Sequence, residues 1–374
     1  MGHRPLLGVT GLVGLLGCGC DPPVAHCGPD TQPPAGAPFV SAPHPAFPSV
    51  SNHGGRLLAR PEVVTVTFAG YAHAAEVGQF GDAVTASQWL AAVAAEYGVV
   101  ASTQLARATL PGPAPAQLTD PELTALLEAQ FGAALPSPES HPDLLLLVYL
   151  GPEVTVTSPD GGVLCSAYDG YHASAAHGGR FAYAVVPDCQ HGLGYTLSTA
   201  AHELVEAAVD PDGDGWFLDV PASDPWSIDN QKEIADLCGD EPLVTFGGYD
   251  LPRIWSNDAA RAGGSPCVPI PPGEVYVNVG ATPATATARV GATVAFTITG
   301  WSTAPIAPWD VFVETNDTSA FDPQAMMCGS SVGNGGTTTL LLSVPQGARS
   351  GDVGAALVYS GGYRRFWPVT LRAE

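Results

Sequence analysis

Short apolar runs and helical repeats of apolar residues alternate through the first two thirds of the chain. The run Val63–Phe68 is rich in β-branched residues and predicts a strand, whereas Ala83–Tyr97 has the apolar spacing of a helix that Gly98 ends. Further strands are predicted over 103–110, 143–150 and 181–186, and further helices from Asp120, over 197–209 and near 231–238. Because strands alternate with helices, we expect an α/β domain with a mostly parallel sheet.

The pattern changes after the linker-like stretch Pro269–Gly273. From there to the end, only strand patterns follow one another at regular spacing, over 275–279, 293–299, 311–314, 337–344, 355–359 and 366–371. Such spacing is typical of an all-β sandwich. We therefore expect an immunoglobulin-like β-sandwich domain over 274–374.

The N-terminus resembles a bacterial lipoprotein signal. A short basic region precedes the apolar stretch Pro5–Leu16, which closes at Cys18, the residue that would be acylated; Cys20 is a poorer candidate. An uncleaved or ordinary secretory signal is the alternative. We expect a signal peptide over 1–17 and, over 18–50, a Pro-rich tether. The protein would then be exported and held at the cell surface or in the periplasm, contacting a membrane only through the lipid.

Composition narrows the class of partner. The chain has 374 residues, of which 45% are hydrophobic, so it can bury a sizeable core. Its 36 acidic and 13 basic residues give a net charge of −23. Nucleic acids and anionic membrane surfaces both require a basic face, so neither is an expected partner.

The eight cysteines fit an oxidising compartment. Acylation of Cys18 would leave seven. We expect two disulfides that flank the candidate site described next, namely Cys165 with Cys189 and Cys238 with Cys267. Cys20 with Cys27 is a further pairing, which would leave Cys328 unpaired.

The sequence His-Glu-Leu-Val-Glu, residues 202–206, lies inside the predicted helix 197–209. His202 and Glu206 are four residues apart and project side by side, while an apolar stripe (Leu197, Ala201, Leu204 and Ala208) lies opposite them. This is the spacing of the two-histidine zinc helix, with a carboxylate in place of the second histidine. The extra negative charge should make a bound zinc ion a weaker Lewis acid. Glu203 would be the general base of a metal-assisted hydrolysis of an amide or ester.

A third metal ligand must come from elsewhere in the chain. In a thermolysin-like arrangement a downstream Glu is the ligand and a nearby Asp orients the histidine, roles that Glu233 and Asp236 fit. Asp212 is an alternative ligand at the metzincin-like offset of ten residues from His202, although Val209 stands where that pattern has a glycine. His191 is a second alternative.

The sequence also offers candidates for stabilising an oxyanion and for binding calcium. His172, Tyr249 and Arg253 are candidates to stabilise an oxyanion, with no spacing that favours one of them. The stretch 210–215 resembles the start of a calcium loop, so Asp210, Asp212 and Asp214 could bind calcium, but Pro221 replaces the closing glutamate.

Several motifs together resemble the exordium, or phosphate-induced, protein family, and in particular its bacterial secreted members. They are the helix motif 202–206 followed by Asp210-Pro211, the stretches Glu233–Cys238, Trp255–Asn257 and Pro266–Val268, and the opening block Asn52–Gly55, with Tyr171-His172 and Tyr183–Val185 as further matches. The resemblance covers Ser51 to Pro269. It implies an extracellular protein in which His202, Glu206, Glu233 and Asp236 form one site, and it does not assign a reaction.

The sequence thus predicts an α/β (α+β) zincin-like domain of gluzincin type over 51–271, followed by the sandwich. Its function would be that of a surface-anchored zinc-dependent hydrolase, most readily a peptidase acting on peptides or proteins. The alternative is a non-catalytic binding or adhesion lipoprotein with a structural or vestigial metal site. The C-terminal domain would then bind a cell-surface glycan or protein.

Overall fold

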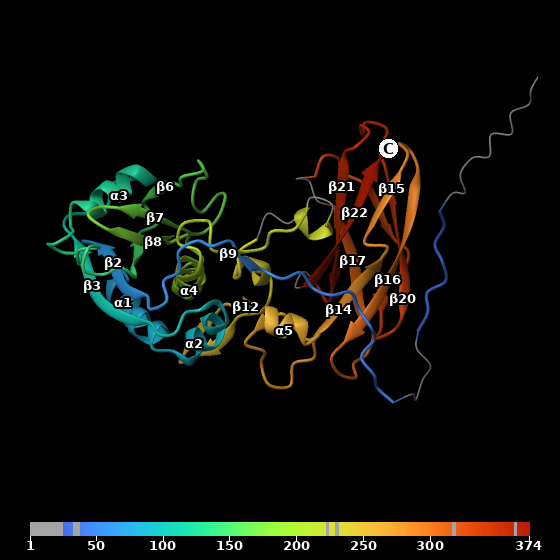
Figure 1. Ribbon diagram of the computed structural model, residues 1–374, viewed down its shortest axis with the longest axis horizontal. Coiled ribbons are helices and arrows are strands. Elements are labelled where there is room, and N and C mark those ends of the chain that lie inside the picture. The colour runs from blue at the N-terminus through green and yellow to red at the C-terminus, as the bar shows by residue number, and fades with distance from the viewer. Residues whose placement is uncertain (1–24, 33–37, 222–223, 229–231, 316–318, 363–364) are drawn as a thin grey trace, which may run out of the picture.

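The computed structural model describes residues 25–32, 38–221, 224–228, 232–315, 319–362 and 365–374. Two lobes lie side by side in Figure 1, one built on a central sheet with helices and the other a sandwich of two sheets. The predicted signal peptide, with Cys18 and Cys20, falls outside the described residues. None of the helices described is both long and apolar enough to span a membrane.

The first lobe contains the central sheet, whose strand order is β3-β2-β5-β8-β7. Its elements are β2 (Glu62–Phe68), α1 (Ala74–Thr85), α2 (Gln88–Ala94), η1 (Ala95–Tyr97), β3 (Thr103–Leu110), β4 (Gln117–Thr119), α3 (Asp120–Glu128), β5 (Leu144–Leu150), β6 (Thr155–Thr157), β7 (Tyr171–Ala176), β8 (Arg180–Pro187) and α4 (Leu193–Val209). Strand β5 is buried along its whole length, as expected for a central strand covered on both faces.

Short elements follow α4 and connect the lobes. They are β9 (Trp216–Phe217), which pairs with β1 (Ser51–Asn52), then η2 (Pro225–Ile228), η3 (Asp236–Cys238), β10 (Val244–Phe246), β11 (Tyr249–Leu251), β12 (Ile254–Trp255), α5 (Asn257–Arg261) and β13 (Cys267–Val268). The pairs β10–β11 and β12–β13 are antiparallel.

The second lobe is a sandwich of a four-stranded sheet, β14-β16-β20-β18, and a five-stranded sheet, β15-β22-β21-β17-β19. Its strands are β14 (Val277–Thr282), β15 (Thr285–Ala288), β16 (Thr293–Ser302), β17 (Trp309–Thr315), β18 (Gln324–Met327), β19 (Ser331–Val332), β20 (Thr337–Ser343), β21 (Val353–Ser360) and β22 (Arg365–Ala373). Apolar residues such as Phe296, Leu340 and Val369 are fully buried in its core.

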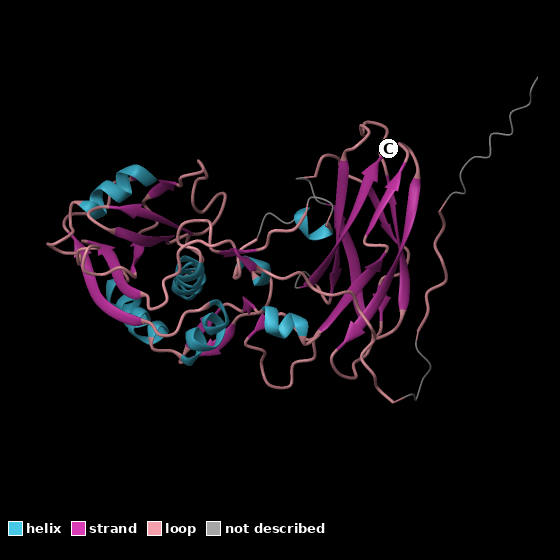
Figure 2. Ribbon diagram, in the orientation of Figure 1, coloured by secondary structure: helices cyan, strands magenta, loops and turns pink. Residues whose placement is uncertain are grey.

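The predicted fold class, an α/β zincin-like domain with a mostly parallel sheet, is wrong. Strands make up 36% and helices 18% of the chain, and most of the strand pairs described are antiparallel (Figure 2). Parallel pairing in the central sheet is confined to β3–β2–β5–β8, and β7 joins its edge antiparallel to β8. The apolar pattern also predicted a short helix near 231–238, where the described residues form the 3-10 turn η3; the rest of the region after α4 consists of short antiparallel pairs, the 3-10 turn η2 and the short helix α5.

Three disulfides are present among the described cysteines. Two are the expected pairs, Cys165–Cys189 and Cys238–Cys267. The third corrects the prediction of a Cys20–Cys27 pairing and an unpaired Cys328, because Cys27 is bonded to Cys328, 301 residues away in sequence. Only the fold brings these two cysteines within bonding distance.

The described part of the Pro-rich N-terminal stretch packs against both lobes. Thr31 forms an isolated bridge with Thr337, and the Ala42 amide donates to the Asn334 side chain. Further along, the Phe47 ring lies among aromatic rings of both lobes (Trp226, Trp255, Tyr276, Trp301 and Trp367). In Figure 1 this blue segment passes beside the sandwich before it enters the first lobe. The N-terminal stretch therefore contacts both lobes and links them.

A cluster of four charged side chains also lies at the junction. Arg253 contacts Glu274 at 2.8 and 2.5 Å and Glu241 at 3.5 Å, and Arg365 of β22 contacts both glutamates at 2.6 Å. Burial by itself would raise the pKa of Glu274. The hydrogen bond and charge of Arg253, together with Arg365, outweigh that effect and hold the pKa below its ordinary value of 4.5.

Because the folded-state pKa of Glu274 is lowered, its ionised form stabilises the fold above the ordinary pKa. This contribution is lost as the pH falls through the folded-state value, below 4.5. We therefore expect the Glu274→Gln variant to be less stable than wild type at pH 7, and the difference to shrink in acid. Urea unfolding at several pH values measures this, with the exposed Glu139→Gln as control. A difference that is independent of pH would contradict the assignment.

Candidate metal site

Helix α4 presents three polar side chains, His202, Glu203 and Glu206, on one part of its surface. The helix follows Gly192, whose φ of 93° lies in the left-handed region, and it ends before Pro211. Its apolar stripe is buried and packs against the central sheet, most closely against β8. The side chains of Glu203 and Glu206 are also almost fully buried, at 7% and 3% exposure, while that of His202 is 22% exposed. Such burial is costly for a carboxylate without partners.

The first group of candidate ligands consists of His202, Glu206 and Asp236. The Nε2 atom of His202 lies 3.0 Å from Glu206 Oε2 and 3.2 Å from Asp236 Oδ1. One donor atom from each residue lies within 4.8 Å of the others. Asp236 was predicted to orient His202 and not to be a ligand. In the structure it faces the same imidazole nitrogen as Glu206 does.

A second group overlaps the first and consists of His172, Glu203 and Glu206. His172, in the edge strand β7, places Nδ1 at 3.3 Å from Glu203 Oε2 and at 3.9 Å from Glu206 Oε2. Its Nε2 atom lies 3.3 Å from Glu233 Oε1 and 3.1 Å from the carbonyl oxygen of Asp210. Glu233, predicted as the third metal ligand, thus contacts His172, and Glu206 is common to both groups.

Sequence reasoning named His172 only as a candidate for an oxyanion, not as a member of this cluster. It lies 30 positions before His202 on a different element, and a lone histidine in a strand has no spacing signal. Only the antiparallel addition of β7 to β8 brings it to the helix.

The segment that carries Glu233 and Asp236 is not the short helix predicted near 231–238. Among the described residues it forms only the 3-10 turn η3, Asp236–Cys238. The amides of Ala235 and Asp236 donate to Glu206 Oε1, at 3.0 and 3.1 Å, instead of to helical carbonyls. The Glu206 carboxylate therefore holds this segment with one oxygen and faces the two histidines with the other.

The electrostatics of the cluster follow from burial and charge. Burial would lower the pKa of His202, but the charge of Glu206 and a hydrogen bond to Asp236 raise it well above 6.5. His172 behaves in the same way, because Glu233 and Glu203 outweigh its desolvation. Burial raises the pKa of Glu206 to about 8, although the positive charge of His202 opposes the shift. Without a metal, both imidazoles therefore hold a proton more firmly than a free imidazole does.

Two of the three separations in the first group suit a zinc ion. Zinc binds imidazole nitrogen and carboxylate oxygen at about 2.0–2.2 Å, so two ligand atoms of a tetrahedral site lie roughly 3.3 Å apart. The separations of 3.0 and 3.2 Å from His202 Nε2 are close to this value.

The alternative ligands lie elsewhere. The Asp212 carboxylate contacts Arg56 at 3.2 Å and Arg180 at 2.9 Å, and His191 contacts the Tyr195 ring instead. The predicted calcium ligands also have other partners: Asp210 Oδ1 accepts from the Gly215 amide. Neither stretch contributes to the ligand groups found among the described residues.

The remaining oxyanion candidates also lie away from the cluster. Tyr249 packs on Phe80, and Arg253 belongs to the charged cluster at the junction of the lobes. Cys165, Asp169 and Cys189 are close enough to resemble a ligand group, but the two cysteines form a disulfide.

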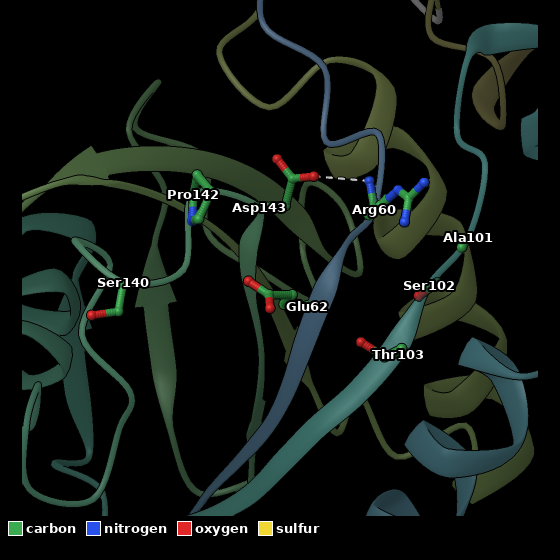
Figure 3. A pocket seen from close by; sticks show the side chains of 8 residues that line it. All are labelled: Arg60, Glu62, Ala101, Ser102, Thr103, Ser140, Pro142 and Asp143. Atoms are coloured by element: carbon green, nitrogen blue, oxygen red, sulfur yellow. Dashed lines mark hydrogen bonds between the residues drawn. The ribbon is translucent and has the colours of Figure 1, made fainter.

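The pocket in Figure 3, with a volume of about 350 Å³, lies at a different place. It is at the start of strands β2 and β3, where the Arg60 amide donates to Asp143, and none of its lining residues belongs to the imidazole–carboxylate cluster. This pocket is therefore separate from the imidazole–carboxylate cluster.

No protein-family model and no curated protein matches this chain. Among solved structures, it is similar to a family 123 glycoside hydrolase from Clostridium perfringens, described for glycolipid glycan hydrolysis, at 10% identity and a TM-score of 0.19. The match covers 27% of each chain. A score this low supports no conclusion about fold or activity.

Proposed function

We propose that this protein is an exported, zinc-dependent hydrolase that cleaves amide or ester bonds, most readily those of peptides. One observation carries the proposal: ligand atoms of His202, Glu206 and Asp236 all lie within 4.8 Å of one another, and the two separations from His202 Nε2, 3.0 and 3.2 Å, suit a tetrahedral ion. These three residues would hold the metal. Glu233, the ligand proposed from sequence, would instead hold His172.

A bound zinc ion would polarise a substrate carbonyl and make an attacking water more acidic. The protein's own part is proton transfer and positioning. Glu203, whose carboxylate lies beside Glu206, would accept a proton from that water and pass it to the leaving amine of an amide or the leaving alkoxide of an ester. His172, held between Glu203 and Glu233, would fix the orientation of the base. The more exposed side chains, His202, Glu233 and Asp236, mark the side from which substrate approaches.

An extracellular place of action is part of the proposal. Three disulfides support it, since such bonds persist in oxidising compartments. The resemblance to secreted proteins of the exordium family agrees with it. Lipid attachment at Cys18 would anchor the protein, and the sandwich would contact a cell-surface glycan or protein.

A second candidate function is non-catalytic binding, with the metal in a structural role. The burial of Glu203 and Glu206 favours it, because little of either carboxylate is open to a substrate.

The deciding experiment compares hydrolysis of a broad peptide and ester panel by the purified protein before and after removal of metal by a chelator. We expect cleavage that disappears with the metal and returns with added zinc. Bound zinc without any cleavage would establish the structural role instead, and a protein that takes up no zinc would overturn both readings of the site.

A further inference from the structure

The charged cluster at the junction of the lobes is connected to the proposed metal site through a short piece of chain. Glu241 follows Asp236 by only five residues. It forms a two-point ion pair with Arg365, whose Nε lies 2.6 Å from Glu241 Oε1 and whose Nη2 lies 3.2 Å from Oε2. Arg365 is the first residue of β22, in the sandwich. A side chain of the second lobe thus holds the segment that carries a proposed ligand of the first.

The contacts that hold Glu241 are almost completely buried. The Glu241 and Arg253 side chains are 3% and 1% exposed. Each arginine contacts both Glu241 and Glu274, and the Arg365 guanidinium also lies 4.3 Å from the centre of the Tyr276 ring. Removing one partner from such a cluster leaves buried charge without compensation, which is far costlier than losing a surface ion pair.

The segment between the two sites has little freedom of its own. The Ile234 carbonyl accepts from the Trp255 amide at 2.8 Å, and Cys238 is bonded to Cys267. Between these points the Ala235 and Asp236 amides donate to Glu206. Arg365 adds a restraint at the far end, at Glu241, whose amide donates to the Cys238 carbonyl at 3.0 Å, so loss of this restraint would act on the turn η3 that begins at Asp236.

Aromatic packing connects the same elements. Trp226, in the turn η2, lies against Phe366 and Trp367 of β22, with ring centres 5.5 and 5.6 Å apart. The sandwich therefore contacts the chain on both sides of residues 232–241, before it through Trp226 and at its end through Glu241.

We infer that Arg365 is a positioning residue for the metal site: through Glu241 it holds the segment 233–241, so that the sandwich is a working part of the site and not a spacer. The positioning of the segment stands on the contacts above, and its effect on metal affinity rests on the function proposed above.

The first test needs no metal. Hydrogen–deuterium exchange of peptides covering 232–241 is compared in the full-length wild type, Arg365→Gln, and two controls. Arg372→Gln removes an arginine from the same strand, and Leu340→Ala destabilises the sandwich core away from Glu241. We expect exchange of this segment to rise at least about tenfold in R365Q only. Equal exchange in R365Q and L340A would overturn the inference.

The second test titrates the same proteins with Co²⁺, whose absorption spectrum reports the ligand geometry. We expect the Co²⁺ affinity of R365Q to fall by roughly 10–100-fold, the usual effect of losing a residue that orients a ligand, with an altered spectrum. Unchanged affinity and spectrum in R365Q would refute the effect on the site. If wild type binds no Co²⁺ although R365Q shows faster exchange, the proposed function fails and the positioning of the segment is retained.

If R365Q does not fold, Arg365→Lys takes its place in both tests. Lysine keeps the charge but lacks the planar fork that contacts two carboxylates at once. We expect R365K to fold and to show the same changes in smaller degree. Wild-type behaviour of R365K in both measurements would overturn the inference.

Discussion

Replacing His202 by alanine is expected to abolish zinc uptake, with a loss of affinity of at least about 100-fold. The imidazole would be the nitrogen ligand of the bound ion and faces both Glu206 Oε2 and Asp236 Oδ1, so its removal leaves only carboxylates that repel one another. Metal analysis of the purified proteins, followed by zinc titration, measures the effect. Wild type should carry about one equivalent.

The matched control is His191→Ala. His191 lies just before the same helix, but its ring contacts Tyr195 and not the carboxylate cluster. This variant should bind zinc like wild type. Equal zinc content in H202A and wild type would rule out His202 as a ligand, and a loss in H191A as well would indicate a site other than the one described.

Replacing Glu203 by glutamine should lower kcat by roughly 10²–10⁴-fold, the usual contribution of a general base. Zinc content should not change, because the proposed ligands are His202, Glu206 and Asp236. Glutamine has nearly the same shape and still offers an oxygen to His172 Nδ1, so the fold should also be retained. Steady-state kinetics on any substrate found in the panel, with metal analysis of the same samples, tests this.

Glu76→Gln is the control for this change, since it removes an exposed carboxylate on α1. It should leave kcat unaltered. Full activity of E203Q would exclude Glu203 as the base, whereas loss of zinc together with activity would make Glu203 a ligand, in the group it forms with His172 and Glu206.

The helix that carries the site could be predicted from local pattern. The apolar stripe opposite His202 and Glu206 required one face of the helix to be buried and placed these two residues side by side, and the structure has them 3.0 Å apart. The roles of Asp236 and Glu233 could not be predicted in the same way. The prediction assumed that both residues lie on one face of a short helix. In the structure two amides of this segment donate to Glu206, and Asp236 faces His202 while Glu233 faces His172.

The fold class failed for a related reason. Alternating apolar runs are equally compatible with strands followed by helices and with strands followed by short antiparallel pairs, because periodicity in a short segment does not distinguish them. Pairing partners decide between these outcomes, and they lie far away in sequence. The edge position of β7 and the pairs β10–β11 and β12–β13 were therefore missed.

Local pattern was enough to predict the features that depend on neighbours a few residues apart: helix α4 with His202, Glu203 and Glu206 on one side, and the buried strand β5. The packing of distant elements decided that His172 joins them, that Asp236 faces His202 while Glu233 faces His172, that Cys27 pairs with Cys328, and that Arg365 contacts Glu241. Periodicity fixes the direction of a side chain relative to its own element, whereas contacts across many residues are set by how the elements pack, which no local spacing encodes.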